Sequence, residues 1–199
     1  MEALIRHFQA KSLLWTLKEG SIIDEPADVL ICSANVSLNL SGGVGADLLG
    51  RYGTTMQNEL HRIIAARTPH VARQGEVFAY TGTELPYKAV LHAVAVDGWY
   101  HSSPDVVRKI IEQSFQMAMS LNANKVALTA LATGFGDLTL EDFADAIRPL
   151  LNRDFSPIKE VWQTTIRIWR WKGIIVVDHL VKTTPRNPAR LGSPVGVHS

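Results

Sequence analysis

The fold is decided by two neighbouring stretches, Ile31-Cys32-Ser33-Ala34-Asn35 and Ser41-Gly42-Gly43-Val44-Gly45-Ala46. The first ends an apolar, β-branched run that is typical of a strand. The second opens an amphipathic pattern that predicts a helix up to Tyr52, where Gly53 ends it. A strand, a glycine loop and a helix in this order present backbone N–H groups at a helix N-terminus, where an anion binds favourably. We therefore expect a phosphorylated small molecule as the ligand.

Composition limits the class of protein. The chain has 199 residues, of which 46% are hydrophobic and 20% charged, with a formal net charge of +1. These values indicate one soluble globular domain with a sizeable core and give no nucleic-acid signal. The single cysteine, Cys32, cannot form an internal disulfide, which favours a reducing compartment. No apolar run approaches the roughly 20 residues that span a bilayer, so we expect a cytoplasmic protein without a membrane segment.

Strands and helices alternate along the chain. We expect strands near residues 4–8, 13–17, 27–33, 75–81, 89–96 and 125–131 and within 160–169. We expect helices over 44–52, from 54 to about 69, from about 104 to 119, and over 139–151. Residues 174–181 fit a strand or a helix equally well. The alternation predicts an α/β fold whose mixed, mainly parallel sheet has helices on both sides. We expect one domain over residues 1–182 and a mobile tail over 183–199.

Local patterns predict some details of these elements. Thr54 and Thr139 stand where each can cap the helix that follows. In the strand at 75–81, Val77 and Ala79 alternate with Tyr80 and a glutamate, which predicts that the first two face the core.

Two loops of the predicted sheet carry glycines, at residues 41–46 and 132–136. Both follow strands, and ligands in such folds bind at the carboxyl ends of the strands. Glycines let the backbone turn sharply and let phosphate oxygens approach it, so two such loops can clamp a diphosphate. The alternative is that they only make tight turns. A P-loop is excluded because Ala46 and Asp47 stand where Lys and Ser/Thr are required, and Leu48 replaces the third glycine of a dinucleotide fingerprint.

Four segments, in order, resemble the macro domain family: residues 27–35, 41–46, 90–94 and 132–136. The resemblance covers roughly residues 12 to 152. It implies a three-layer α/β/α fold and binding of ADP-ribose or a related nucleotide-diphosphate-ribose ligand, free or attached to a protein. It implies no metal and no cofactor.

The resemblance also implies roles for individual residues. Asn35 stands where the family's asparagine contacts the distal ribose, and an amide suits a vicinal diol. The two glycine loops would bind the diphosphate, and Phe135 would cover the distal ribose unless it is a core residue. The implied ligand-binding set is Ser21, Ile22, Asn35, Gly42, Gly43, Val44, Gly45, Thr133, Gly134, Phe135 and Gly136.

The chain departs from the family pattern at two positions. Ser21 stands where many members have an aspartate that bonds the adenine amino group, and a hydroxyl is a weaker acceptor than a carboxylate. Gly45 stands where many hydrolytic members have an aspartate. Asp47 lies two residues further on, and we expect it to point elsewhere. The missing carboxylate at Gly45 favours a binding module over a hydrolase that removes ADP-ribose or cleaves its esters. Ser21 keeps a further alternative open, a macro-like fold that binds no nucleotide and acts as an interaction scaffold.

Under the hydrolase alternative the candidate catalytic residues are Asn35 and Asp137, which would hold a water between them and the phosphates. Asp97, at the end of a predicted strand, is a further candidate for the same role. For both aspartates the competing interpretation is an ordinary surface carboxylate. His101 either lines a pocket or lies on an exposed loop.

Other residues have ordinary structural interpretations. His92 lies in an apolar strand, which favours a core histidine over a catalytic one, and Cys32 is expected to pack as a small apolar group. Tryptophans and cations alternate after residue 161, which fits either base stacking or a half-buried strand: Trp162, Arg167, Trp169, Arg170, Trp171 and Lys172.

Overall fold

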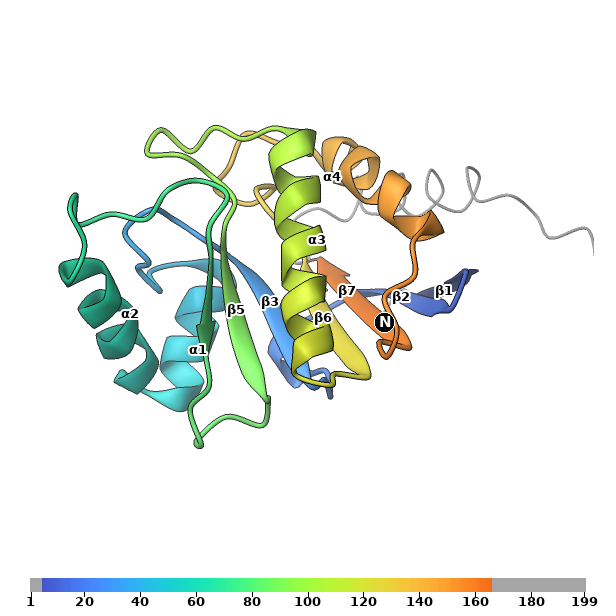
Figure 1. The fold of residues 1–199 in the computed structure, drawn as a ribbon, viewed down its shortest axis with the longest axis horizontal. Coiled ribbons are helices and arrows are strands. Elements are labelled where there is room, and N and C mark those ends of the chain that lie inside the picture. The colour runs from blue at the N-terminus through green and yellow to red at the C-terminus, as the bar shows by residue number, and fades with distance from the viewer. Residues whose placement is uncertain (1–4, 166–199) are drawn as a thin grey trace, which may run out of the picture.

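A computed structural model describes residues 5–165 (Figure 1). Residues 174–181 and the predicted tail lie outside the described residues, as do Arg167, Trp169, Arg170, Trp171 and Lys172. The described part contains one seven-stranded sheet. Its strands are β1 (Ile5–Ala10), β2 (Leu13–Glu19), β3 (Val29–Ala34), β4 (Val77–Tyr80), β5 (Ala89–Val94), β6 (Lys125–Thr129) and β7 (Glu160–Thr165).

The strand order across the sheet is β1-β2-β7-β6-β3-β5-β4. The strands from β2 to β5 in this order are parallel, whereas β1 and β4 pair antiparallel at the two edges. The prediction of a mixed, mainly parallel sheet is therefore confirmed. Because the parallel strands need crossovers, helices lie on both faces of the sheet.

The α-helices are α1 (Gly43–Tyr52), α2 (Thr55–Ala65), α3 (Pro104–Ser120) and α4 (Leu140–Ile147), with short 3-10 helices η1 (Ile22–Asp24) and η2 (Arg148–Asn152). The pair α3 and α4 packs on one face of the sheet, and α1 and α2 pack on the other. Alternate residues of β3 serve the two cores: Val29 and Ile31 join the α3/α4 side, and Leu30 and Cys32 join the α1/α2 side. This is the expected three-layer α/β/α arrangement.

Three local predictions are wrong. Thr54 precedes α2 but makes no side-chain cap bond. In β4 Val77 packs against the α3/α4 core as predicted, but Ala79 is exposed and Tyr80 packs in the α1/α2 core. The helix predicted over 139–151 ends as an α-helix at Ile147, since Pro149 has no N–H for a continuing i→i−4 bond, and the chain goes on as η2.

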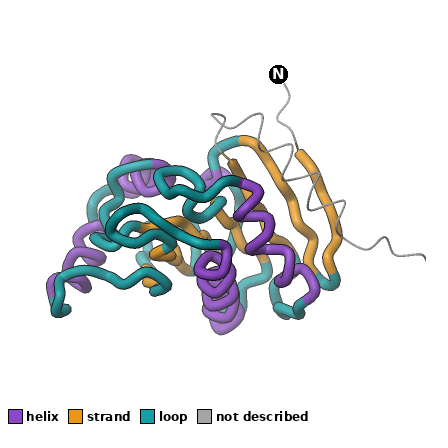
Figure 2. Tube along the Cα trace, turned by 90° about the horizontal axis from the view of Figure 1, so that it is seen from above, coloured by secondary structure: helices purple, strands orange, loops and turns teal. Residues whose placement is uncertain are grey.

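The carboxyl ends of the central parallel strands lie at one edge of the sheet, which is uppermost in Figure 1. Figure 2 looks down on this edge and shows loops covering the strand ends between the helices. The loops after β3, β5 and β6 therefore meet at this edge. Between residues 5 and 165 the structure contains no helix that is both long and apolar enough to cross a membrane.

Candidate functional site

A cavity of about 300 Å³ lies at the carboxyl edge of the sheet. This volume is at the lower end of the range of about 300–1,000 Å³ for small-molecule sites. The structure brings to its walls every residue that the sequence predicts to bind the ligand: Ser21, Ile22, Asn35, Gly42, Gly43, Val44, Gly45, Thr133, Gly134, Phe135 and Gly136. The two glycine loops and the segment around Ser21 thus share one cavity, although they are far apart in the sequence.

The N-terminus of α1 forms one wall of this cavity. Gly42 is the N-cap residue, and no side chain caps the helix. The first N–H that bonds back into the helix belongs to Ala46, which donates to the Gly42 carbonyl. The N–H groups of Gly43, Val44 and Gly45 precede it and have no intrahelical acceptor. Together with the positive end of the helix dipole, these donors form a favourable place for an anion.

The second glycine loop closes over the first through Phe135. A Cβ built on Gly42 would lie 2.7 Å from Cε2 of Phe135, so the ring lies directly against the Gly42 backbone. Phe135 is 77% exposed, which excludes the alternative that it is a core residue. The exposed ring therefore bridges the two glycine loops beside the N-terminus of α1.

Two glycines of these loops lie close to backbone atoms. A Cβ on Gly136 would lie 2.3 Å from the carbonyl oxygen of Ala132, so this position requires glycine unless the loop shifts. A Cβ on Gly45 would lie 3.1 Å from Cα of Leu40, a tight contact that a shift of a few tenths of an ångström relieves. Packing therefore disfavours a side chain at position 45 without excluding it.

The amide of Asn35 shapes the loop that leads to the first glycines. Its Oδ1 accepts hydrogen bonds from the backbone N–H groups of Ser37 (3.0 Å) and Asn39 (3.2 Å), and its Nδ2 donates to the Asn39 carbonyl (3.3 Å). Gln57 of α2 holds the same loop, since its Oε1 accepts from the N–H of Leu40 (2.6 Å) and its Nε2 donates to the carbonyl of Leu38 (3.0 Å). No local pattern predicts this role for Gln57, because polar residues are common on the exposed face of an amphipathic helix.

The two aspartates considered for holding water do not line the cavity. Asp137 accepts hydrogen bonds from Nδ1 of His101 and the N–H of Ser102, each at 2.9 Å. Asp97 accepts from the N–H groups of Trp99 (2.8 Å) and His101 (2.9 Å). The geometry thus assigns both carboxylates to loop structure and gives no support to a catalytic role for Asp137.

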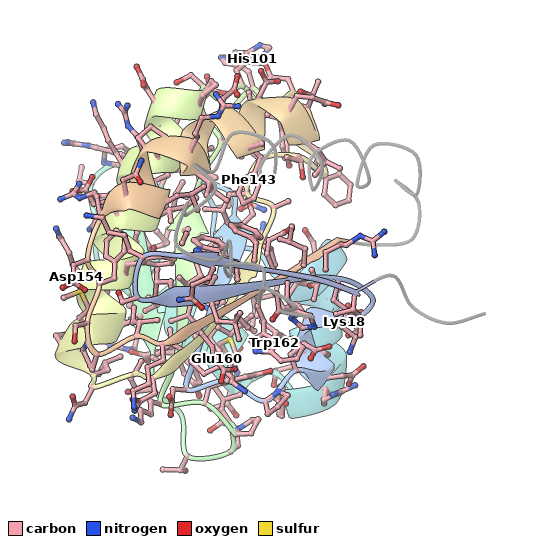
Figure 3. The ribbon with its side chains drawn as sticks, turned by 90° about the vertical axis from the view of Figure 1, so that its right-hand side faces the viewer. Lys18, His101, Phe143, Asp154, Glu160 and Trp162 are labelled. Carbon is pink, nitrogen blue, oxygen red and sulfur yellow. The ribbon has the colours of Figure 1, made fainter. Side chains whose placement is uncertain are left out.

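The bridge between His101 and Asp137 ties the loop after β5 to the loop after β6. Figure 3 shows His101 at the edge of the molecule that carries the cavity, far from Glu160 at the amino end of β7. The hydrogen bond lowers the pKa of Asp137 and raises that of His101. Of the aromatic residues beside His101, Tyr100 lines the cavity, whereas Trp99 does not and is 82% exposed.

Asp47 lines the cavity, which corrects the expectation that it points elsewhere. Residues four apart lie on the same face of a helix, so Asp47 stands one turn above Gly43. Among the residues that line the cavity within the described part of the chain, Asp47 is the single carboxylate, and there is no Lys, Arg or His. The positive potential of the site therefore comes from backbone dipoles rather than from cationic side chains.

His92 and Cys32 are core residues, as predicted. Both are fully buried, and Nδ1 of His92 lies 3.6 Å from Sγ of Cys32 while its Nε2 lies 3.2 Å from Sδ of Met56. Burial lowers the pKa of His92 to about 4 and raises that of Cys32 to about 12. The histidine is therefore neutral and the thiol protonated near pH 7.

Trp162 lies on β7 and packs under Lys125, whose Nζ is 5.2 Å from the ring centroid, while its indole N–H donates to Glu160. This surface contact supports the half-buried strand rather than base stacking. Over residues 5–165, no group of histidine, cysteine and acidic side chains is arranged to hold a metal ion.

Known proteins resemble this chain in sequence and in fold. A macro domain-containing protein of Streptomyces griseus is 27% identical over 147 residues, covering 73% of this chain and 83% of the relative. The Oceanobacillus iheyensis macrodomain with ADP superposes with a TM-score of 0.76 at 15% identity, over 92% of this chain and 97% of that one. A Trypanosoma brucei macrodomain in complex with ADP-ribose gives a TM-score of 0.68 at 18% identity, over 84% and 68% of the two chains.

The structural neighbours establish the fold, and the sequence establishes the family. The Macro domain family matches residues 31–147, which is more than half of the 199 residues. This segment runs from the end of β3 through both glycine loops to the end of α4. The chain belongs to the macro domain family.

Proposed function

We propose that this protein binds ADP-ribose or a closely related nucleoside diphosphate ribose in the cavity at the carboxyl edge of the sheet. One observation carries the proposal: the uncapped N-terminus of α1 and the second glycine loop face the same cavity, and Phe135 lies against Gly42 between them. Backbone N–H groups on two sides suit a diphosphate, which has acceptor oxygens on both phosphorus atoms.

Each part of the proposed ligand is matched to residues along the cavity. The N–H groups of Gly43, Val44 and Gly45 bind the diphosphate, and Phe135 covers the distal ribose. Asn35 stands beside them and retains one amide hydrogen that its loop does not use, since only one of its donors is bonded to Asn39. The Oceanobacillus iheyensis and Trypanosoma brucei macrodomains, whose fold this chain shares, were solved with ADP and with ADP-ribose. An ADP-ribosylated protein is a possible source of the same group.

Calorimetric titration with ADP-ribose, ADP and ribose 5-phosphate tests this proposal. We expect ADP-ribose to bind about tenfold or more tightly than ADP, because the distal ribose adds contacts with Phe135 and Asn35. Ribose 5-phosphate is expected to bind weakest, since it has a single phosphate. No heat with ADP-ribose at millimolar concentration would overturn the assignment of the ligand.

One observation favours a second function, the hydrolytic removal of ADP-ribose from a carrier. Asp47 places a carboxylate in the cavity one turn from the proposed diphosphate site. In this reaction a water attacks C1″ of the distal ribose and the bond from C1″ to the carrier breaks. Asp47 takes the proton of the water, and the carrier atom leaves with the bonding electrons and is protonated by solvent.

A de-ADP-ribosylation assay with Asp47→Asn separates the two functions. A hydrolase loses turnover in this variant by about 100-fold while its affinity for ADP-ribose stays within about threefold, because the amide keeps the shape of the side chain. A wild-type protein that binds ADP-ribose but releases none from a modified protein is a binding module.

A further inference from the structure

Three exposed aromatic side chains gather at the edge of the molecule that carries the cavity. Among the phenylalanine, tyrosine and tryptophan residues between positions 5 and 165, only Trp99, Tyr100 and Phe135 are exposed, at 82%, 46% and 77%. Tyr100 and Phe135 line the cavity, and Trp99 directly precedes Tyr100. We call these three residues the aromatic rim. Exposed aromatic residues in one place are typical of a surface that binds a partner, because each buries a large apolar area on contact.

The loop that carries Trp99 and Tyr100 is held in one conformation by hydrogen bonds. The N–H of Asp97 donates to the carbonyl of His101 (3.0 Å), and the N–H of Tyr100 donates to the carbonyl of Asp97 (3.2 Å). Gln74 donates from Nε2 to the same His101 carbonyl (2.8 Å). Tyr100 has a φ of +65°, a left-handed conformation that is unfavourable for a bulky residue. The fold keeps both rings exposed despite this strain, and a preordered loop loses little entropy when a partner binds.

The aromatic rim lies beside the end of the ligand to which a carrier is attached. The proposed function places the distal ribose at Phe135, and a carrier is bonded to this ribose. The hydrogen bond between His101 and Asp137 (2.9 Å) ties the loop of Phe135 to the loop of Tyr100. We therefore expect a carrier to leave the cavity past these two loops. Trp99 does not line the cavity, so it is available to the carrier rather than to free ADP-ribose.

The loops around the cavity carry an excess of negative charge. Residues 35–47, 95–105 and 130–142 include no lysine and no arginine, and six acidic residues: Asp47, Asp97, Asp105, Asp137, Glu141 and Asp142. The cations that pair with these acids are His101, which bonds Asp137, and Arg108 of α3, which bonds Asp105 at 2.8 Å. The remaining negative charge repels the phosphates of a nucleic-acid carrier and attracts a cationic carrier.

We infer that the aromatic rim docks a basic segment of an ADP-ribosylated protein, with an arginine or lysine beside the modified residue placed over the Trp99 ring. The inference rests on the proposed function, because it requires the ADP-ribose group to be bound in the cavity. A cation over an aromatic face is attracted by the ring quadrupole, and tryptophan is the best partner of this kind. The same contact occurs within this protein, where Nζ of Lys125 lies 5.2 Å from the ring centroid of Trp162.

The first test is calorimetry on the full chain with three probes. These are free ADP-ribose, a peptide that carries ADP-ribose on a central serine flanked by arginines, and the same modified peptide with glutamates in place of the arginines. We expect the arginine peptide to bind about fivefold more tightly than free ADP-ribose, and the glutamate peptide to bind more weakly than free ADP-ribose. The difference between the two peptides should shrink at high ionic strength, because salt screens exposed charges.

The second test removes the indole ring with Trp99→Ala. We expect this variant to bind the arginine peptide no more tightly than free ADP-ribose, whose own affinity should stay within about twofold of wild type, since Trp99 does not line the cavity. Trp99→Phe keeps an aromatic face and should retain part of the gain. Ile5→Ala is the matched control, because Ile5 is also an exposed apolar residue but lies on β1 and does not line the cavity. It is expected to leave all affinities unchanged.

The outcomes separate this inference from the proposed function. If free ADP-ribose binds but the two peptides bind equally well, or if Trp99→Ala keeps the gain of the arginine peptide, the docking surface is wrong and the proposed function stands. An ADP-ribosylated oligonucleotide that binds more tightly than the arginine peptide would also overturn it, by assigning the aromatic rim to nucleic acid. If neither free ADP-ribose nor any modified probe binds, the proposed function fails and the docking surface fails with it.

Discussion

The N-termini of α1 and α4 lie at the same edge of the sheet, but only that of α4 is capped by side chains. At α4, the Thr139 side chain accepts a hydrogen bond from the N–H of Asp142, and the Asp142 side chain accepts from the N–H of Thr139. At α1, glycine occupies the N-cap position, no side chain caps the helix, and no acid stands in the first turn. Side chains of the protein cap α4, whereas none caps α1, whose N-terminal residues line the cavity. The contrast supports the proposal that a ligand binds at the N-terminus of α1.

The largest expected effect comes from blocking the open end of α1 with Gly43→Glu. Gly43 has a φ of +53°, and open space surrounds its Cα. A glutamate there places negative charge where the diphosphate is expected, so affinity for ADP-ribose should fall by about 100-fold or more. Calorimetry measures this loss, and the left-handed conformation costs about 1–2 kcal/mol of stability in addition.

Gly50→Glu is the matched control for this variant. Gly50 lies on the same helix, also faces open space, and does not line the cavity. This variant adds the same charge to α1 and should leave affinity within about twofold, since an exposed charge beyond the first turn interacts weakly with the site. Wild-type affinity in Gly43→Glu would show that the N-terminus of α1 is not the anion site.

A smaller effect is expected from opening the capped end of α4 with Thr139→Ala. The substitution removes the capping box and should lower the free energy of unfolding by about 1 kcal/mol. Denaturant unfolding measures this change. Affinity for ADP-ribose should stay within about twofold of wild type, because Thr139 does not line the cavity. A large loss of affinity with unchanged stability would place the start of α4 in the binding site and contradict the contrast between the two helices.

The smallest expected effect concerns pH and the bridge between His101 and Asp137. The hydrogen bond to Asp137 raises the pKa of His101, and Asp97 adds attraction for the charged ring. Because the folded pKa lies above the unfolded value of 6.5, the stabilisation is complete below about pH 6.5 and is lost as pH rises through the folded pKa. Tyr100 and Phe135 belong to the two bridged loops, so affinity should fall about two- to threefold between about pH 6 and pH 9.

Calorimetry across this range measures the effect, with His101→Gln as the reference. The glutamine does not titrate in this range and should give a nearly flat profile. An equal fall of affinity in the variant would assign the pH dependence to another group, or to the ligand.

Much of the molecule could be predicted from local sequence rules. Apolar runs located the buried strands β3, β5 and β6, and the Thr139 cap located α4. The two glycine loops of the candidate site were predicted in the same way, because parallel strands deliver their loops to one edge. Ser21, Asn35 and Phe135 were assigned only by the resemblance to the macro domain family. The burial of Tyr80 in β4 was not predictable, since both faces of this strand contact apolar cores and alternation alone does not show it.

The residues that the sequence did not assign share one property: their position is set by tertiary contacts. Asp47 reaches the cavity because α1 runs alongside the site, so that its second turn as well as its N-terminus lines the cavity. Thr129 and Thr164 line the cavity side by side because they are paired residues of β6 and β7. Neither relation is visible in the sequence around the residue concerned.

The reactivity of the Cys32 thiol reports how often the native protein opens transiently. The chain has a single thiol, which is fully buried in the centre of the sheet and held protonated, so a thiol-specific reagent reacts only with molecules that have transiently opened around β3. The rate of labelling in native buffer therefore measures how frequently the structure around β3 opens. Since β3 leads directly into Asn35 and the first glycine loop, a ligand bound there should lower the labelling rate in proportion to its occupancy.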